Sequence, residues 1–410
     1  MIQKERYTKI LTLLHSKNLE FIQQAYALAE VLLDTPEKYF DFLSLIHEDY
    51  NFSSTKESFQ NLVDCDLSDT LTYLYKEIHE SVQKASTGYN FPHVGNISLW
   101  LTCHAATIYK ELEELEELNL EEIGYLDTLP HNITNFKNLK VFHSPSSIEM
   151  FPSNFENLSC LETLVLKHSN IKQLPKMGPT VTTIEMSYTK IEEIACFPPF
   201  LRKLTCTNWD KFHEEICQAT TLEELEVETR MEHLPVHFTQ LTNLKSLSIR
   251  GGNSNSSTGL LQLPSTIHLL SKLEYLSLHA NKLEKLPESF GQLTSLKYLS
   301  LYRNEFRIFP VEICTLTSLT ELNLASNKLE IIPKELSSLR LLEKLDVFSN
   351  QITDLTKSLS QLSCLKELDL SHNYITRFPS EVLKLKKLEK LSIGHNPMRF
   401  EELPNCVIGW

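Results

Sequence analysis

This 410-residue sequence lacks several features, and each absence excludes a class of protein. Basic residues are not in excess, since 39 Lys and Arg stand against 53 Asp and Glu, a formal charge of −14. Nucleic acids and anionic membrane surfaces require a basic footprint, so neither is expected as a partner. The opening segment MIQKERYTKILTLL is charged and amphipathic, which predicts neither a signal peptide nor a membrane span. We therefore expect a cytoplasmic protein.

Paired cysteines are also missing. The nine cysteines are an odd number, contain no C-x-x-C pair and are scattered along the whole chain, at 65, 103, 160, 196, 206, 217, 314, 364 and 406. This distribution argues against a disulfide framework and against a zinc site. Several of the cysteines simply occupy positions where an apolar residue is expected.

Catalytic motifs are absent too, with no P-loop, G-x-G-x-x-G, G-x-S-x-G or H-E-x-x-H segment. Cys103 and His104 are adjacent in an expected helix, where consecutive side chains point about 100° apart, so a nucleophile and base pair is disfavoured. His372 and His395 hold the same position in adjacent repeats and should lie about 5 Å apart. Two ligands without a third favour a polar surface over a metal site. We predict no enzymatic activity, cofactor or metal.

What the sequence does contain is a repeat. Segments of the form L-x-x-L-x-L begin at residues 115, 139, 161, 181, 201, 222, 244, 273, 296, 319, 342, 365 and 388, and from 273 onward the spacing is always 23. A fixed period of this size, with alternating apolar residues followed by Asn, is typical of a leucine-rich repeat. Each repeat then contributes one short strand and a return segment. The predicted fold is α/β, a horseshoe-shaped solenoid with a parallel concave sheet of about 12 to 13 repeats.

Stacking is a physical requirement of this pattern. Burying an apolar side chain stabilises by about 1.5 to 3 kcal/mol, but ordering the backbone costs about 1 to 2 kcal/mol per residue, so a single repeat cannot fold alone. An Asn follows each regular strand and can bond the backbone of neighbouring turns, where an unpaired polar group would cost about 1 to 3 kcal/mol. We predict a structural ladder formed by Asn281, Asn304, Asn327, Asn350, Asn373 and Asn396.

The earlier repeats are less regular. Their spacing falls to 20 residues, and Ser169, Thr189 and Trp209 replace the Asn. Repeats this short leave no room for a helix on the convex side, and their prolines indicate extended return segments. One interval of 29 residues contains the polar, glycine-rich segment GGNSNSST at 251–258, which predicts a surface loop beside the concave strands.

Residues 1–114 lack the repeat and are expected to form an all-α N-terminal domain. Apolar residues recur at helical spacing near residues 10–14 and 21–32, with further helices expected at 68–86 and 96–113 and a capping box at Ser54–Glu57. This region carries a charge of −8. It should cover the open end of the first repeat. Residues 115–398 form the expected solenoid, and residues 399–410 form an expected short C-terminal cap.

The regular turns, such as LTELNLASNKLEIIPKELSSLR, resemble the LPxxI-type repeats of cytosolic Ras-binding scaffolds and of many bacterial leucine-rich repeat proteins. The 20-residue turns, such as LPKMGPTVTTIEMSYTKI, resemble the short repeats of bacterial effectors that are delivered into host cells. The resemblance covers roughly residues 115–400 and implies the fold. Effectors with ubiquitin-ligase activity carry a C-x-D motif, which this sequence lacks, so that activity is not implied.

Alternation along each strand turns the leucines inward and leaves the intervening residues on the concave face. Exposed Tyr, Arg and Phe are the residue types enriched at protein interfaces. The predicted partner-binding residues are Arg250, Tyr275, His279, Tyr298, Tyr302, Arg303 and Phe348. Stacked tyrosines also stabilise a sheet by about 0.2 to 1 kcal/mol, which is the competing explanation. A second, acidic candidate consists of Glu224, Glu226 and Glu228 with Glu185.

The sequence thus favours a non-enzymatic protein, a monomer or weakly self-associating, that binds a partner protein on its concave face. One alternative is a bacterial effector-type protein whose helical N-terminal domain carries an activity or targets a host factor, which would place it inside a host cell. A self-associating scaffold is the other.

Overall fold

The computed structural model describes residues 2–14, 19–35, 38–39, 42, 94–105, 114–121, 126–209, 212–252, 258–378 and 380–398. These residues fall into two compact units, residues 1–200 and residues 201–410. The predicted helix at 68–86, the capping box at Ser54–Glu57 and the predicted cap at 399–410 lie outside the described residues. The division between the two units, at residue 200, falls within the repeats. It does not test the predicted domain boundary at residue 114, which stays a prediction.

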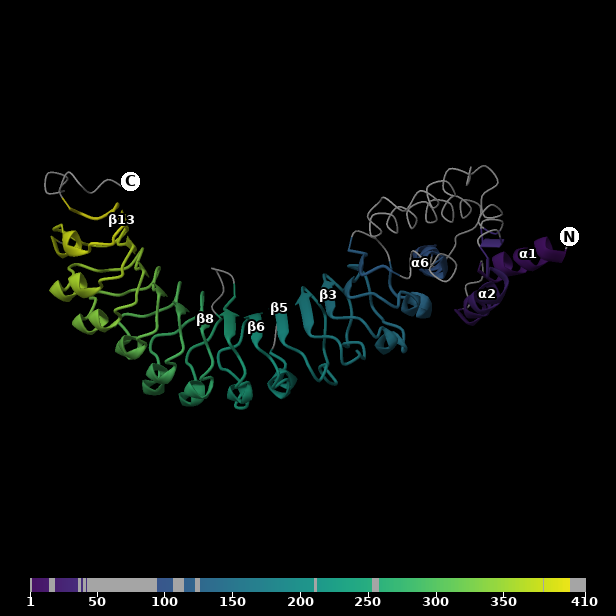
Figure 1. Ribbon diagram of the computed structural model, residues 1–410, viewed down its shortest axis with the longest axis horizontal. Coiled ribbons are helices and arrows are strands. Elements are labelled where there is room, and N and C mark those ends of the chain that lie inside the picture. Colours follow the sequence, from purple (N-terminus) through teal and green to yellow (C-terminus); the bar gives the residue numbers. More distant parts are fainter. Residues whose placement is uncertain are drawn as a thin grey trace. The chain divides into compact units, whose positions relative to one another are not determined.

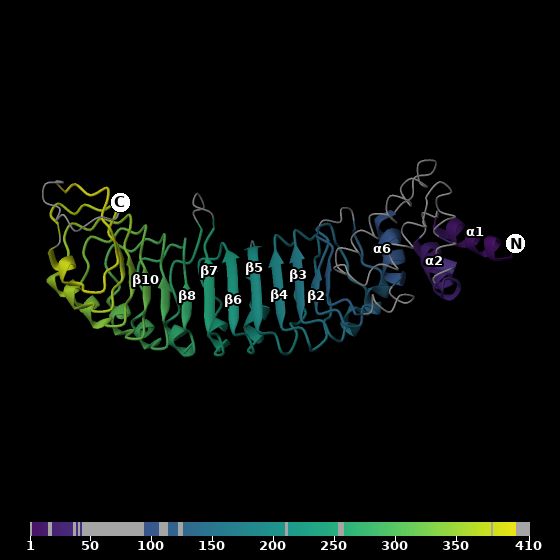
Figure 2. The same cartoon turned by 45° about the horizontal axis from the view of Figure 1, so that its top comes forward.

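Short parallel strands form the sheet of each unit, and each strand begins two residues after the first residue of an L-x-x-L-x-L segment (Figures 1 and 2). In the first unit β1 to β4 pair in chain order, and in the second unit β5 to β13 do so. The predicted α/β repeat fold with a parallel sheet is therefore confirmed. The strands are β1 (Glu117–Asn119), β2 (Val141–His143), β3 (Thr163–Lys167), β4 (Thr183–Ser187), β5 (Lys203–Trp209), β6 (Glu224–Thr229), β7 (Ser246–Arg250), β8 (Tyr275–Ser277), β9 (Tyr298–Ser300), β10 (Glu321–Asn323), β11 (Lys344–Asp346), β12 (Glu367–Asp369) and β13 (Lys390–Ser392).

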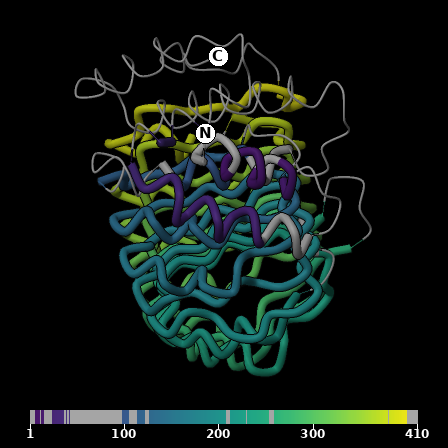
Figure 3. The backbone as a smooth tube through the Cα atoms, turned by 90° about the vertical axis from the view of Figure 1, so that its right-hand side faces the viewer, coloured from purple at the N-terminus to yellow at the C-terminus, as the bar shows by residue number. Residues whose placement is uncertain are grey.

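The register between strands follows the sequence pattern. Leu276 of β8 is paired with Leu299 of β9, and both side chains are fully buried. Because side chains alternate along a strand, the residues on either side of each leucine lie on the concave face. Figure 3 shows the turns of each unit stacked one behind another. A continuous apolar core runs through the stack of each unit, as the period predicts.

Whether a return segment contains a 3-10 turn depends on the length of its repeat. Longer repeats form a 3-10 turn on the side away from the strands, and the two 20-residue repeats that begin at residues 161 and 181 have none. The prediction that short repeats leave no room for a helix is confirmed. The turns are η3 (His131–Asn135), η4 (Phe155–Asn157), η5 (Glu214–Gln218), η6 (Phe238–Gln240), η7 (Ser265–Leu269), η8 (Glu288–Gln292), η9 (Val311–Thr315), η10 (Lys334–Ser338), η11 (Lys357–Gln361) and η12 (Ser380–Lys384).

The asparagine ladder lies where the chain leaves each strand. The Oδ1 atom of Asn304 accepts a hydrogen bond from the backbone N–H of Leu283 at 3.0 Å, and its Nδ2 atom donates to the carbonyls of Leu278 and Leu301 at 2.9 and 3.0 Å. Asn327, Asn350 and Asn373 repeat this pattern and are buried. Each amide thus pairs backbone groups of two successive turns, as predicted.

The 29-residue interval departs from the regular turn at Gly251. A Cβ atom at this position would lie 1.9 Å from the carbonyl oxygen of Ala280, so no side chain fits there. After the insertion the chain rejoins the ladder at Leu260, whose N–H donates to Asn281 Oδ1 at 2.9 Å. Residues 253–257 of the predicted surface loop lie outside the described part of the chain.

Helices occupy the start of the chain, as predicted: α1 (Ile2–Leu14), α2 (Leu19–Leu32) and α6 (Val94–Ala105). Helix α6 packs against η3 of the first repeats, where the Asn132 Nδ2 atom donates to the carbonyl of Trp100 at 3.0 Å. Leu115, Leu118 and Leu120 of the first repeat are at most 3% exposed. The end of the first unit's stack is therefore covered.

Candidate functional site

Two stacked tyrosines begin the candidate surface on the concave face of the second unit. Strands β8 and β9 place Tyr275 and Tyr298 side by side, with ring centroids 4.3 Å apart and planes only 7° from parallel. Tyr275 is 38% exposed and Tyr298 is half-buried. Burial raises the pKa of the Tyr275 phenol, and the neighbouring Tyr298 raises it further. The Tyr275 phenol is therefore neutral and can donate a hydrogen bond at pH 7.

Four more predicted residues lie at the ends of β7, β8 and β9. His279 is half-buried, and burial followed by the charge of Arg250 lowers its pKa. The Arg303 guanidinium lies 5.3 Å from the centre of the Tyr302 ring, within cation–π range. Arg250 at the end of β7 is exposed and approaches the Glu228 carboxylate at 4.0 Å.

A second aromatic group lies further along the same face. Phe348 meets the ring of His372 edge-on at 4.9 Å, and His372 stacks on His395 with ring centroids 4.0 Å apart. The predicted proximity of the two histidines is confirmed. Among the described residues, three or more side chains suitable for binding a metal are nowhere grouped together. Ala325 holds the position between Tyr302 and Phe348, so the aromatic row has a gap there.

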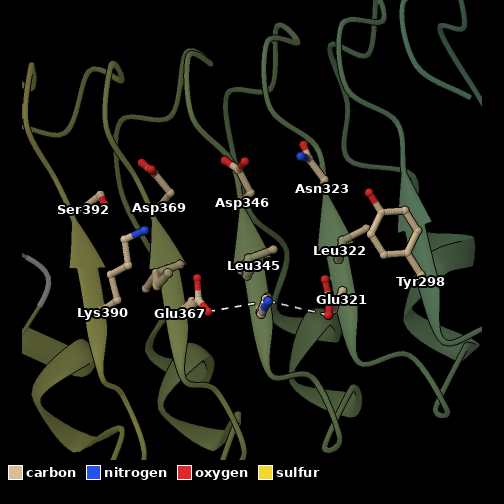
Figure 4. A pocket seen from close by; sticks show the side chains of 12 residues that line it. Tyr298, Glu321, Leu322, Asn323, Leu345, Asp346, Glu367, Asp369, Lys390 and Ser392 are labelled. Atoms are coloured by element: carbon tan, nitrogen blue, oxygen red, sulfur yellow. Dashed lines mark ion pairs between the residues drawn. The ribbon is translucent and has the colours of Figure 1, made fainter. Parts of the chain in front are cut away.

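A hollow lies on the concave face of the second unit, from β9 to β13 (Figure 4). The side chains that line it are those of Tyr298, Glu321, Leu322, Asn323, Lys344, Leu345, Asp346, Glu367, Leu368, Asp369, Lys390 and Ser392. Near the start of the strands, the Lys344 Nζ atom lies 3.7 Å from Glu321 and 3.6 Å from Glu367. The charge of Lys344 thus offsets part of the negative charge of the two glutamates.

Two aspartates lie next to each other near the strand ends of the hollow. Asp346 of β11 is in register with Asp369 of β12. Each uses its Oδ1 atom to accept a 2.9 Å hydrogen bond from a backbone N–H two residues ahead, from Phe348 and Ser371 respectively. Burial raises the pKa of Asp346, and the charge of Asp369 raises it further, while the Phe348 N–H acts in the opposite direction. Like charges at this spacing repel each other.

The structure places all seven predicted residues on or at the end of the strands of the second unit. It brings Tyr275, Tyr298, His279, Tyr302 and Arg303 together on β8 and β9. Ser277 and Ser300, which the alternation also predicts to face water, are only 5% and 4% exposed. Sequence reasoning missed Glu367, Asp369 and Lys390, although the same alternation, continued past residue 348, would have found them.

The acidic residues and Cys103 are weaker candidates for a functional site. On β6, Glu224 lies 3.6 Å from the Lys203 Nζ atom and Glu228 lies beside Arg250, so two of the three predicted carboxylates already have a cation nearby. Glu185 belongs to the other unit. Cys103 is buried in α6, and burial raises the pKa of its thiol, which disfavours the nucleophilic thiolate.

Comparison with known proteins agrees with this architecture. A family model for the leucine-rich repeat region matches residues 254–350, and a second leucine-rich repeat model matches residues 341–398. This chain is a leucine-rich repeat protein. Proteins of this fold in general serve protein interaction and are typically non-enzymatic. Among curated protein sequences, none matches the chain.

Several solved structures are similar to this chain over most of its length. A leucine-rich repeat protein of Leptospira interrogans is 26% identical, with 76% of this chain and 92% of that chain covered and a TM-score of 0.59. An internalin of Listeria monocytogenes is 22% identical over 71% of this chain and 84% of its own, with a TM-score of 0.56. A plant peptide hormone receptor, solved in complex with RGF2, is 21% identical over 72% of this chain and 50% of its own, with a TM-score of 0.51. No helix in the described part of the chain could span a bilayer.

Proposed function

We propose that this leucine-rich repeat protein binds a partner protein on the concave face of its second unit, without enzymatic activity. The observation that carries the proposal is the group formed by Tyr275, Tyr298, Tyr302 and Arg303 on β8 and β9 or just after β9, of which Tyr298 lines the hollow. Tyrosine and arginine dominate binding energy at protein interfaces because they combine large contact area with hydrogen bonding. Strands linked by the Asn ladder hold these side chains in place before binding, which lowers the entropy cost of association.

A cytoplasmic location belongs to this proposal, on the compositional grounds given above. The likeness to a plant receptor solved in complex with RGF2 is compatible with a polypeptide partner.

The test is affinity capture from a lysate with the intact chain and with the double variant Tyr298→Ala/Tyr302→Ala. Removing both rings should abolish capture of the partner and leave the unfolding temperature within a few degrees of the original, since both side chains are partly exposed. Tyr374→Ala is the matched control, because Tyr374 is 59% exposed in the same unit but lies outside the strands. Equal capture by the tyrosine variant and the intact chain would exclude this face.

The effector-type alternative makes a different prediction. A fragment of residues 1–114 that folds alone and shows an activity in a screen would favour it, and light scattering of the intact chain measures self-association.

A further inference from the structure

The charges on the concave face of the second unit are distributed unevenly, and this unevenness indicates what kind of partner segment fits. Near the start of the strands, Glu321, Lys344 and Glu367 alternate in sign on successive strands and pair with one another. Lys390 continues the alternation on β13. The formal charges of the four residues in this row sum to zero.

The next row along the strands is not balanced. It consists of Asn323, Asp346, Asp369 and Ser392, so two adjacent carboxylates are present with no cation in the row. Among the described residues, neither aspartate forms an ion pair within 4 Å, although Lys390 is near enough to act on Asp346 at longer range. The Oδ1 atom of each is bonded to the backbone, and in Figure 4 both carboxylates rise from the strands into the hollow.

The opposite charge lies at the other end of the surface. Arg303 is exposed, rests on the Tyr302 ring and forms no ion pair with any residue that the structure describes. Arg250, two strands away, shares its charge with Glu228. Arg303 follows β9, the strand whose Tyr298 lines the edge of the hollow, and Asp346 lies two strands further on. Strands are about 4.8 Å apart and residues about 3.3 Å apart along a strand, so the two charged ends are separated by roughly 12 to 16 Å.

We propose that the concave face binds an extended segment of the partner protein that carries an acidic side chain and a basic side chain four or five residues apart. The acidic side chain pairs with Arg303, the basic side chain enters the hollow between Asp346 and Asp369, and the residues between them pack on Tyr298. A separation of about 12 to 16 Å corresponds to four or five residues of extended chain. This inference rests on the proposed function and adds the chemistry of the partner.

The charge arrangement also explains how wrong partners are rejected. A segment of uniform negative charge would meet the two aspartates, and a segment of uniform positive charge would meet Arg303. Like charges brought together in an interface oppose binding, so the surface selects for order and spacing of charge as well as for its sign.

The test uses a phage-displayed library of random linear peptides, about twelve residues long so that each can span the surface, selected on the intact chain. Enriched sequences should contain an acidic and a basic residue four or five positions apart. The best synthetic peptide should bind about tenfold more weakly to Asp346→Asn/Asp369→Asn or to Arg303→Gln. Asn323 occupies the same row with the same backbone hydrogen bond, so the asparagine variant should fold normally. Matched controls are Asp354→Asn and Arg307→Gln, both exposed and outside the strands, which should change affinity less than twofold.

A second peptide selection, on a variant in which the charge of the hollow is reversed, tests the same inference. On Asp346→Arg/Asp369→Ser the preference for a basic residue should change to an acidic one, because the field in the hollow is reversed. Enrichment of peptides without the charge pair, an unchanged preference on the swapped variant, or no enrichment at all overturns the inference. If the enriched peptides lack the charge pair but bind less well to Tyr298→Ala/Tyr302→Ala, this inference fails while the proposed function still holds. Capture from a lysate tests the proposed function separately.

Discussion

At the residue scale, the ladder asparagines stabilise the solenoid because each one satisfies backbone groups that no water can reach. Asn304 alone forms hydrogen bonds with one backbone N–H group and two carbonyl groups, which belong to two successive turns. An apolar replacement leaves these groups buried and unpaired, and each such group costs about 1 to 3 kcal/mol before relaxation.

Asn304→Ala should therefore lower the free energy of unfolding by about 2 to 4 kcal/mol. Urea unfolding followed by circular dichroism measures the loss. Asn323→Ala is the control, because Asn323 is half-buried and serves only the N–H of Ala325, so its loss should be clearly smaller. Equal stability of Asn304→Ala and the intact chain would contradict the buried-ladder explanation.

The residue before each ladder asparagine has an unusual backbone. Ala280, Arg303, Ser326, Ser349, His372 and His395 all have φ between +54° and +56°. None is glycine, so each carries some strain, on the order of 1 to 2 kcal/mol. The Asn hydrogen bonds fix the turn and compensate for it. Arg303, His372 and His395 of the candidate surface are among the residues with this conformation.

Asp346 gives a pH-dependent prediction. Its pKa in the folded protein lies above the ordinary value, so at neutral pH the ionised carboxylate destabilises the fold relative to the unfolded chain. Protonation removes this effect as the pH falls. Asp346→Asn should therefore stabilise the protein at pH 7, and the gain should vanish at acid pH, where the native carboxyl is protonated.

Thermal unfolding of both proteins between pH 3 and pH 8 checks this, with the pH range set by ordinary carboxyl titration. A gain that stayed constant over the whole range would show that charge is not the cause. Stabilisation together with lost peptide binding would mark Asp346 as a residue kept for binding at the expense of stability.

At the scale of elements, helix α6 contains a buried titratable group. The His104 ring stacks on Trp100 with centroids 5.1 Å apart, and its Nε2 atom lies 2.9 Å from the carbonyl oxygen of Leu33. Burial lowers the pKa of His104 below 6.5, although the Leu33 carbonyl and the charge of Glu30 act in the opposite direction. The folded helix therefore holds the neutral imidazole.

The neutral state of His104 in the folded protein determines how the stability changes with pH. The stability that neutral His104 contributes is complete above pH 6.5, the ordinary pKa, and is lost as the pH falls toward the lower folded-state pKa. Denaturant unfolding followed by tryptophan fluorescence should show the first unit weakening between pH 7 and pH 5. In His104→Gln this weakening should be smaller. An identical pH dependence in both proteins would assign the effect to other groups.

At the scale of the whole molecule, a stack of repeats needs a covered end. The buried state of Leu115, Leu118 and Leu120 shows that the first repeat does not face water, and α6 packs beside it. Repeats depend mainly on their immediate neighbours, so damage at one end should stay near that end.

Deleting residues 1–113 should therefore weaken the first repeats far more than the distant ones. Amide hydrogen exchange followed by mass spectrometry should show faster exchange at β1 and β2, with β9 to β11 protected as in the intact chain. The full-length protein is the reference. Unchanged protection at β1 and β2 would show that the helical region is dispensable for stability.

The sequence by itself determined the repeat fold, because a 23-residue period with alternating leucines can be buried only by stacking, and each strand begins where the pattern indicates. It also determined the stacked Tyr275–Tyr298 pair and the buried Asn ladder, since both depend only on register between equivalent positions. Tertiary structure alone decided which concave residues are accessible. Ser277 and Ser300 hold the predicted positions yet are buried.

Tertiary structure also decided where charge remains unbalanced. The Lys344 ammonium lies between the carboxylates of Glu321 and Glu367, while Asp346 and Asp369 have no cation within 4 Å among the described residues. Whether two charges neutralise each other depends on distances between side chains that are 23 or more residues apart in the chain, and a pattern of residue types does not contain these distances.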